Sequence, residues 1–441
     1  MVVFILKNTL LKIFWSLPYL SPKYKEKLFF TILRILGKQK YHYVIKDETT
    51  YGRYCKQILS LFDIRDAGDF VTENEIVFIR EKSDPKLIAY YLPQFYPFKE
   101  NDNWWGKGTT EWNNVSKAVP QFLGHYQPRL PGELGYYDLR IKENILRQIQ
   151  LAKVYGIYAF CYYYYWFDGK RLLDHPLDLF LKSKEMRFPF CLCWANEDWT
   201  RNFSGSSGEV IVKQSKSVES YKNFILGLEK YLVDDRYLTI ERKKVLIVYK
   251  PSHIPRTLDV LKYWREYLYD ILHTDLYLIA VKGSHDNTDY LKVGFDAVTE
   301  FQPTSDISKR NMQINEEMEF VTPEFYGIVY DYQKIVKNQI YLKHQSSKLY
   351  RAVMPMWDNT ARRNNKGAVF HGSTPELYEQ WLLDTIKSTK ERKDLEDQLV
   401  FINAWNEWGE GAYLEPDRRY GYAYLQATRN AIEKSRNFKN A

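Results

Sequence analysis

The chain has 441 residues, of which 45% are hydrophobic and 27% are charged. This balance is typical of a folded globular protein and excludes a disordered or collagen-like chain. The length exceeds the ~150 residues of an average domain, but one α/β barrel with insertions can reach it. The net charge is +8, and the chain has no repeat at the roughly 20 to 50 residue period of solenoids and propellers.

The first 46 residues are strongly basic. They contain one acid, Glu26, and nine basic residues: Lys7, Lys12, Lys23, Lys25, Lys27, Arg34, Lys38, Lys40 and Lys46. Apolar residues interleave with these cations, as in a helix that lies in a membrane interface and is attracted to anionic lipid. A helical hairpin packed on the main domain, with Pro18 and Pro22 in its turn, is the alternative interpretation. No base-reading motif accompanies the charge, so we expect no nucleic-acid partner.

The same stretch indicates where in the cell the protein is expected. No apolar run reaches the roughly 18 residues that span a bilayer, because Lys7 and Lys12 interrupt the first candidate. A secretory signal also fits badly, since no basic segment precedes the apolar residues and no small-residue cleavage site follows them. We therefore expect a cytoplasmic protein with peripheral contact to the inner membrane face through residues 1–40.

A charged link from Arg80 to Pro85 separates a basic helical N-terminal region, residues 1–84, from a second domain, residues 85–441. In the second domain short β-rich runs alternate with helical stretches. The predicted strands span residues 87–92, 157–163, 188–194, 245–249, 276–281, 297–301, 352–357 and 399–405. The predicted helices lie near residues 141–155, 173–186, 217–232, 257–272, 285–293, 324–345, 374–390 and 418–434. Eight alternating pairs, with neither a G-x-G-x-x-G segment nor a P-loop, predict an α/β fold of the (β/α)8 TIM-barrel type with a small helical N-terminal extension.

The ends of the predicted strands carry carboxylates, amides and indoles. In a barrel these ends converge on one cavity, and the loops 93–140 and 195–215 are long enough to shape it. Aromatic faces that stack on sugars, with acids and amides that bind hydroxyls, favour a carbohydrate ligand. The predicted substrate-binding residues are Tyr91, Gln94, Trp104, Trp105, Glu111, Trp112, Trp194, Asn196, Glu197, Lys250, Glu300, Trp357, Asn406 and Trp408.

The sharpest signal is the segment from Trp405 to Gly411, in which Glu407 and Glu410 stand three residues apart after the last strand. General acid and base roles need two carboxyl groups in different environments. We therefore predict that Glu407 and Glu410 are catalytic. The alternative is that one acid pairs with Arg418 or Arg419, or caps the last helix.

Metal and cofactor chemistry lack a signature. The eight histidines include no H-x-x-x-H pair, and no D-x-D triplet is present. Neither the number nor the spacing of the four cysteines resembles a zinc site or a disulfide scaffold. We therefore expect reduced thiols, no metal and no cofactor.

Four segments together resemble one known family. They are Ile88 to Tyr96, Trp104 to Gly108 with Thr110 to Trp112, Trp194 to Glu197, and Asn403 to Gly411. In this order they resemble the WbsX-like proteins of bacterial polysaccharide biosynthesis, which have a glycoside hydrolase family 99-like domain, and the resemblance covers roughly residues 85 to 430. It implies a (β/α)8 barrel.

Family 99 enzymes are retaining endo-mannosidases and mannanases with an Asn-Glu-Trp-His-Glu-Gly segment after the last strand, and Glu407 and Glu410 match its two acids. The likeness implies that Glu407 takes the proton from the sugar 2-hydroxyl, which attacks the anomeric carbon, and that Glu410 protonates the leaving oxygen. This sequence departs from the pattern at Gly409, where the family has histidine, so a substrate contact is missing.

The resemblance implies a glycosyltransferase of surface polysaccharide biosynthesis, of the O-antigen, capsule or lipopolysaccharide type, that acts through a retaining two-carboxylate site. Its partner would be an oligosaccharide or a lipid-linked glycan. An endo-acting, mannanase-like or mannosidase-like hydrolase is one alternative. A catalytically silent carbohydrate-binding subunit is the other.

Overall fold

The computed structural model describes residues 48–60, 69–200, 209–283, 286, 288–321, 324–343 and 346–438. The basic stretch of residues 1–46, with its predicted membrane contact, lies outside these residues. No helix within the described ranges is long and apolar enough to cross a bilayer.

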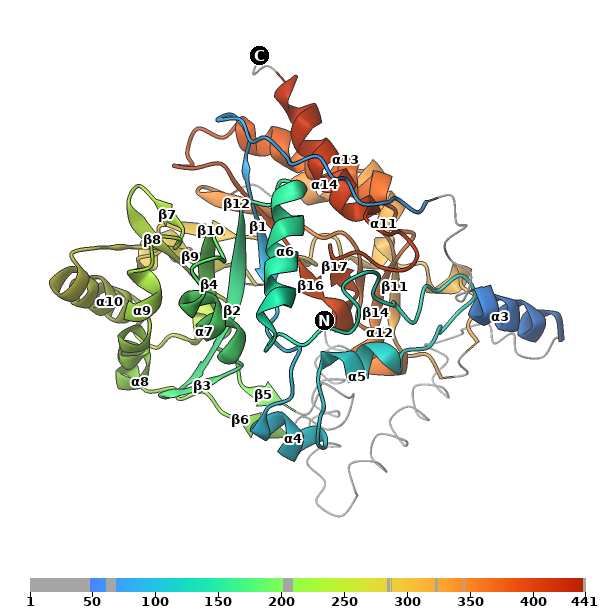
Figure 1. Ribbon diagram of the computed structural model, residues 1–441, viewed down its shortest axis with the longest axis horizontal. Helices are drawn as coiled ribbons and strands as arrows, with labels where there is room; N and C mark the ends of the chain where they lie inside the picture. The colour runs from blue at the N-terminus through green and yellow to red at the C-terminus, as the bar shows by residue number, and fades with distance from the viewer. Residues whose placement is uncertain are drawn as a thin grey trace, which may run out of the picture.

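Eight parallel strands form a closed barrel (Figure 1). They are β1 (Lys86–Tyr91), β2 (Ala159–Phe167), β4 (Phe190–Trp194), β8 (Lys243–Val248), β9 (Leu276–Val281), β10 (Ala297–Thr299), β12 (Leu349–Val353) and β15 (Leu399–Ile402). The barrel closes because β1 pairs with both β2 and β15. Two short antiparallel strands extend it, β3 (Lys170–Leu172) on β2 and β7 (Thr239–Ile240) on β8. The predicted (β/α)8 barrel is confirmed.

The strands form where the sequence is apolar without alternation, because both faces of a barrel strand are buried. Aromatic rings fill the interior. The ring of Tyr90 lies 5.7 Å from Tyr163, 5.0 Å from Phe301 and 5.7 Å from Phe401, measured between centroids. The barrel is therefore a packed core rather than a pore.

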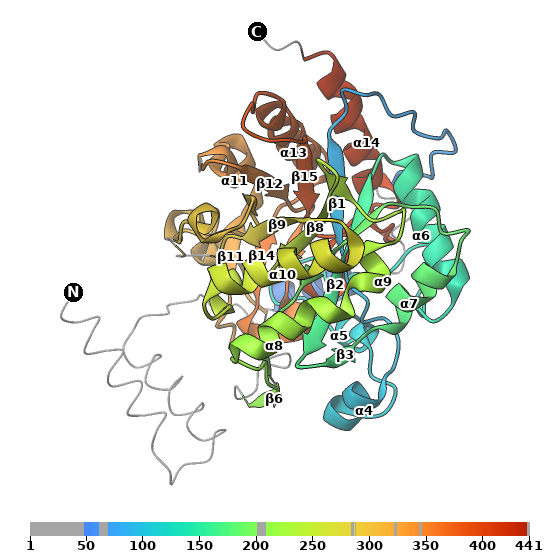
Figure 2. The same cartoon turned by 90° about the vertical axis from the view of Figure 1, so that its left-hand side faces the viewer.

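Helices cover the barrel at most of the predicted positions. They are α6 (Lys142–Val154), α7 (His175–Lys182), α8 (Val218–Asn223), α9 (Glu229–Leu232), α10 (Thr257–Leu272), α13 (Pro375–Lys390) and α14 (Ala423–Arg436). Figure 2 shows α10 in front of β8 and β9. The start of α13 has a physical cause, since Thr374 accepts a hydrogen bond from the Leu377 amide and Pro375 presets the first turn.

Three predicted helices differ from the structure. The helix predicted at 217–232 is interrupted by the 3-10 turn η3 (Phe224–Gly227), and in place of the helix near 285–293 the described residues form only η5 (Tyr290–Val293). The helix predicted at 324–345 begins instead as a strand, β11 (Ile328–Asp331), followed by α11 (Tyr332–Lys337) and η8 (Ile340–Leu342). The strand forms because β11 pairs with a partner some 40 residues later, β14 (Ala368–His371).

Segments before and after β12 build part of the rim. A small sheet joins β11, β14 and β13 (Trp357–Asp358), and α12 (Thr360–Arg363) and η9 (Asn364–Lys366) follow β13. Further short elements lie beyond the carboxyl ends of the barrel strands (Figure 1). They are α4 (Lys99–Trp105), α5 (Glu111–Ser116), β5 (Trp199–Thr200), β6 (Val210–Val212), η4 (Pro251–His253), η6 (Arg310–Met312), η7 (Asn315–Glu317), β16 (Asn406–Glu407), η10 (Trp408–Glu410) and β17 (Ala412–Tyr413).

The segment before the barrel packs on its wall. The Val71 amide donates to the Tyr420 carbonyl at 3.1 Å, and the Val71 carbonyl accepts from the Tyr422 amide at 2.9 Å. The Phe78 side chain is buried, and Arg436 binds the Asp84 carboxylate at 2.8 Å. Further upstream, α3 (Glu48–Ser60) contacts a barrel loop, where Gln57 accepts from the Gly124 amide at 2.8 Å. The domain boundary at residues 84 and 85 stays a prediction.

Candidate active site

The rim holds a cavity of about 550 Å³. Its walls are formed by side chains from β2, β13 and α12, from the turn after β15, and from the segments that follow β4, β8 and β10. They include Tyr163, Tyr165, Glu197, Trp199, Tyr249, Phe301, Trp357, Arg362, Glu407 and Glu410. The two predicted catalytic acids therefore open into one cavity at the end of the barrel where barrel enzymes place their chemistry.

A short hairpin after β15 presents both acids. The side chain of Asn406 accepts from the Leu92 amide at 2.7 Å and donates to the Leu92 carbonyl at 3.0 Å, which ties the loop after β15 to the end of β1. Strand β16 then pairs antiparallel with β17, so that Glu407 lies opposite Ala412. The turn between them ends at Gly411, whose φ of +56° is a conformation that favours glycine.

The guanidinium of Arg362 joins three carboxylates. Its Nη2 lies 2.8 Å from Glu407 Oε2, its Nη1 lies 2.7 Å from Glu410 Oε1, and its Nε lies 2.7 Å from Glu111 Oε1. Arg362, Glu407 and Glu111 are buried, whereas the Glu410 side chain is 24% exposed. Because both catalytic candidates touch one guanidinium, they can act on one bond of one ligand.

Burial sets the protonation of the two acids. It raises the pKa of Glu407 to about 8, assisted by the negative charges of Glu410 and Glu111 and opposed by Arg362. Burial also raises the pKa of Glu410, against the same opposing effect of Arg362. Ionising all three carboxylates around one cation is energetically unfavourable. Glu407 and Glu410 together therefore retain a proton at neutral pH and can serve in acid and base catalysis.

A buried aspartate anchors the element that carries Arg362. Asp358 accepts hydrogen bonds from the Thr360 amide at 3.0 Å and from Gln127 Nε2 at 2.7 Å, and it lies 2.8 Å from His125 Nε2. Burial disfavours the ionised form, but His125 and Arg129 hold the pKa of the Asp358 carboxyl well below its usual range. Asp358 therefore stays charged and fixes the first turn of α12.

The backbone of Gly409 touches the Glu111–Arg362 ion pair. A Cβ atom added at residue 409 would overlap Glu111 Oε1 and would lie 2.8 Å from Arg362 Nε. The place that a side chain at this position would take is therefore occupied by the ion pair. This gives a physical reason for the glycine at the position where family 99 has histidine.

Aromatic rings line one side of the cavity. Gln94, Trp104, Trp105, Tyr165 and Trp199 surround a narrow extension of about 70 Å³ that also reaches Arg362 and Glu407. The Tyr165 and Trp199 rings meet edge to face with centroids 5.1 Å apart. On another side, Lys250 Nζ lies 3.4 Å from Glu197 Oε1. Stacking surfaces beside charged hydrogen-bonding groups suit a sugar.

The predicted site residues fall into two groups. Those that line a cavity of the rim are Gln94, Trp104, Trp105, Glu197, Lys250, Glu300, Trp357, Glu407 and Glu410. Those that are buried without lining one of these cavities are Tyr91, Glu111, Trp112, Trp194, Asn196, Asn406 and Trp408. In the second group Tyr91 donates to Gln148 at 2.6 Å, Asn196 binds the Lys250 backbone at 2.8 Å, and Trp408 donates to Glu415 at 2.6 Å.

The sequence interpretation missed Arg362, which is the central cation of the site. Tyr163, Tyr165 and Trp199 stand at the ends of predicted strands but are not among the predicted substrate-binding residues. The signal for Arg362 was available, since Thr360, Ala361, Arg362 and Arg363 directly follow the segment Trp357 to Asn359 at the end of the seventh strand. The alternative drawn from the sequence pairs the site acids with Arg418 or Arg419, which follow them in the sequence, and not with Arg362. Among the described side chains, no group of three or more His, Cys, Asp or Glu residues has the arrangement of a metal site.

We expect Gly409→Ala to destabilise the fold by about 3 to 5 kcal/mol, because the methyl group would push Glu111 away from Arg362 and leave buried charges without partners. Chemical denaturation followed by tryptophan fluorescence measures this change. Gly227→Ala is the matched control, since an added Cβ there meets only Tyr164 Oη at 3.5 Å. An unfolding midpoint for Gly409→Ala equal to that of the control would contradict the interpretation.

Comparisons with known proteins agree with the sequence motifs. The protein WxcX of Xanthomonas campestris pv. campestris strain B100 is 40% identical over 349 residues, which cover 79% of this chain and 50% of WxcX, and WxcX of strain ATCC 33913 matches equally. The chain thus spans about half the length of the curated relatives it matches.

Solved structures resemble the barrel. A glycoside hydrolase-like protein, 13% identical, aligns with a TM-score of 0.51 over 82% of this chain and 98% of its own, which is a likeness of fold. The GH99 endo-alpha-mannosidase from Bacteroides thetaiotaomicron, 15% identical, aligns with a TM-score of 0.48 over 79% of this chain and 97% of its own. A family model described as Glycosyltransferase WbsX matches residues 87–428. The chain therefore belongs to the WbsX glycosyltransferase family, as its motifs predicted.

Proposed function

We propose that this protein transfers glycosyl units in the biosynthesis of a bacterial surface polysaccharide, through a retaining site formed by Glu407 and Glu410. The observation that carries the proposal is the sharing of one buried guanidinium, that of Arg362, by both acids at the wall of one cavity. The family match and the aromatic walls support a glycan substrate.

The reaction needs two steps. In the first step, Glu407 accepts the proton of the sugar 2-hydroxyl, and the 2-oxygen of the sugar attacks the anomeric carbon. At the same time Glu410 gives its proton to the departing glycosidic oxygen. In the second, an acceptor hydroxyl gives its proton to Glu410 and attacks the same carbon, and Glu407 returns its proton to the 2-oxygen. Configuration is retained because two displacements occur, and both acids end as they began.

Arg362 suits such a cycle, because its guanidinium contacts both acids and can stabilise negative charge on either one. An acceptor sugar captures the intermediate in place of water when the site excludes water and holds the acceptor well. The rings of Trp104, Trp105 and Trp199 provide apolar cover of this kind.

Hydrolysis is the alternative outcome of the same chemistry, with water as the acceptor. The product decides between the two. Purified full-length protein would be incubated with mannan or with lipid-linked glycan from the host, with and without nucleotide sugars, and the products followed by mass spectrometry. New linkages support transfer, shortened chains show hydrolysis, and binding without product indicates a silent carbohydrate-binding subunit.

We expect Glu407→Gln and Glu410→Gln each to lower turnover by roughly 10² or more, because each removes one proton-transfer group. Initial rates in the product assay measure the loss. Glu266→Gln is the matched control, since its side chain is 61% exposed on α10, and it should keep the full rate. Full rates in both active-site variants would refute the assignment.

We expect kcat/KM to rise with pH through about 8. Burial raises the pKa of Glu407 to about 8, so below that pH the group is protonated and cannot accept the 2-hydroxyl proton. A pH profile of initial rates measures the rise. Glu197→Gln is the control, because Glu197 lines the same cavity but does not contact Arg362. In this variant kcat/KM should rise through the same pH. A rate that falls through this range would instead assign Glu407 as the acid.

We also propose that residues 1–40 bring the protein to lipid-linked glycan at the inner membrane face, on the basis of their basic and apolar sequence. Full-length protein should sediment with vesicles that contain anionic lipid, whereas a variant without residues 1–40 should stay in the supernatant. Vesicles of neutral lipid serve as the control. Equal behaviour of the two proteins on anionic vesicles would exclude the proposed contact.

A further inference from the structure

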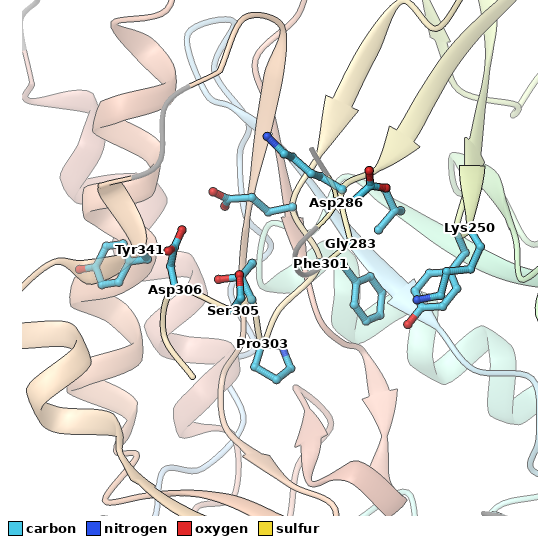
Figure 3. A pocket seen from close by; sticks show the side chains of 13 residues that line it. Lys250, Gly283, Asp286, Phe301, Pro303, Ser305, Asp306 and Tyr341 are labelled. Atoms are coloured by element: carbon cyan, nitrogen blue, oxygen red, sulfur yellow. The ribbon is translucent and has the colours of Figure 1, made fainter. Parts of the chain in front are cut away.

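A second cavity, of about 350 Å³, lies beside the first on the rim. It is formed after three neighbouring strands, by Tyr249 and Lys250 after β8, by Lys282 and Asp286 after β9, and by residues 300, 301 and 303–306 after β10. Figure 3 shows Phe301 between Lys250 on one side and Ser305 on the other. Its volume lies in the range of about 300 to 1,000 Å³ that small-molecule sites occupy.

The two cavities share a wall. Tyr249, Phe301 and Pro303 line both of them, and the rings of Tyr249 and Phe301 meet edge to face with centroids 5.1 Å apart. Glu407 and Glu410 line the first cavity and not the second. A ligand in the second cavity would therefore lie beside the cavity of the two acids without contacting them directly.

Two lysines, Lys250 and Lys282, and three acids, Asp286, Glu300 and Asp306, line the second cavity. Several of these charges already have partners, since Lys250 Nζ lies 3.4 Å from Glu197 Oε1, Asp306 lies 2.8 Å from Lys309 Nζ, and Glu300 is bound by Arg351 at 3.2 Å and by the Ala352 amide at 3.0 Å. A phosphate or a carboxylate group placed there would meet acids of its own sign, which disfavours an anionic ligand. An uncharged ligand meets no such repulsion.

The polar groups of this wall suit hydroxyls. Lysines only donate hydrogen bonds and carboxylates only accept them, while the hydroxyls of Thr304 and Ser305 do both. A sugar presents several hydroxyls that both donate and accept, together with an apolar face that can lie on Phe301 or Tyr249. The cavity thus has the composition of a carbohydrate site.

We propose that the second cavity is a saccharide subsite, which binds an uncharged sugar unit of the same glycan whose reacting bond lies at Glu407 and Glu410. This inference deepens the proposed function, because it makes the substrate an oligosaccharide long enough to cross the wall of Tyr249 and Phe301. The protein then selects its glycan by chain length as well as by the unit at the acids.

The test measures binding rather than turnover, in full-length Glu407→Gln protein. The ligands are manno-oligosaccharides of increasing length, and neutral and acidic fragments of the host surface polysaccharide separated by length. Isothermal titration should show a step of about tenfold or more in affinity once the oligosaccharide reaches the second cavity. The step should be larger for neutral fragments than for acidic ones.

Ser305→Trp, added to the same protein, should fill the cavity and abolish the step while leaving the affinity for short oligosaccharides unchanged. Asp306→Asn, which removes one charge without adding bulk, should reduce the step and guards against a folding defect in the first variant. Asn311→Trp is the matched control, because residue 311 is exposed and does not line the cavity.

Each outcome decides the inference. An affinity that does not change with length, a step that survives Ser305→Trp, or tighter binding of acidic fragments through this cavity would overturn it. The proposed function is judged separately, by product formation with the unaltered protein. A step that Ser305→Trp removes, without any product from the unaltered protein, would sustain the subsite and refute the transferase.

Discussion

The site depends on one buried cation. Arg362 lies among Glu111, Glu407 and Glu410, at hydrogen-bond distance from each. Moving an ion from water into a protein interior is unfavourable unless partners surround it, and removing one partner leaves the others uncompensated. The four side chains are therefore stable only together. The electrostatic interactions among them also influence the pKa values of Glu407 and Glu410, which face the cavity.

The position of this cation is fixed by chain segments far apart in the sequence. Arg362 sits in α12, which Asp358 holds through Thr360, while Glu111 begins α5 in the long loop after β1. The two acids come from the hairpin after β15, at the other end of the barrel sequence. Barrel closure through β1 and β15 brings these segments together, so the fold supplies the proximity and the loops supply the groups.

Much of the fold could be predicted, because a barrel strand is buried on both faces and its sequence is locally unmistakable. The runs around Cys161 and Leu192 show this. Strand β11 is harder to predict. Ile328, Val329 and Tyr330 favour a strand, but this short run leads directly into the helical sequence of α11, and its partner β14 is adjacent only in the fold. The two acids were visible because they are close in sequence. Arg362 was overlooked because its partnership with them exists only in three dimensions.

The aromatic residues mark the other limit of prediction. Trp105 lies in the loop after the first predicted strand and lines a cavity. Trp194 ends the third predicted strand but stacks on Phe224 in the core, with ring centroids 3.7 Å apart. Composition alone does not separate an indole that contacts ligand from one that supports the wall, because both are large and amphipathic. Trp194 is a core residue because the turn η3, which carries Phe224, covers the end of β4.

Gly409 also makes two positions that are far apart in the sequence depend on each other. Because Glu111 occupies the volume over its α-carbon, any larger residue at 409 is compatible only with a smaller or differently placed side chain at 111. The residues at positions 111 and 409 together, rather than the acid hairpin alone, therefore decide whether the cluster can assemble in this form.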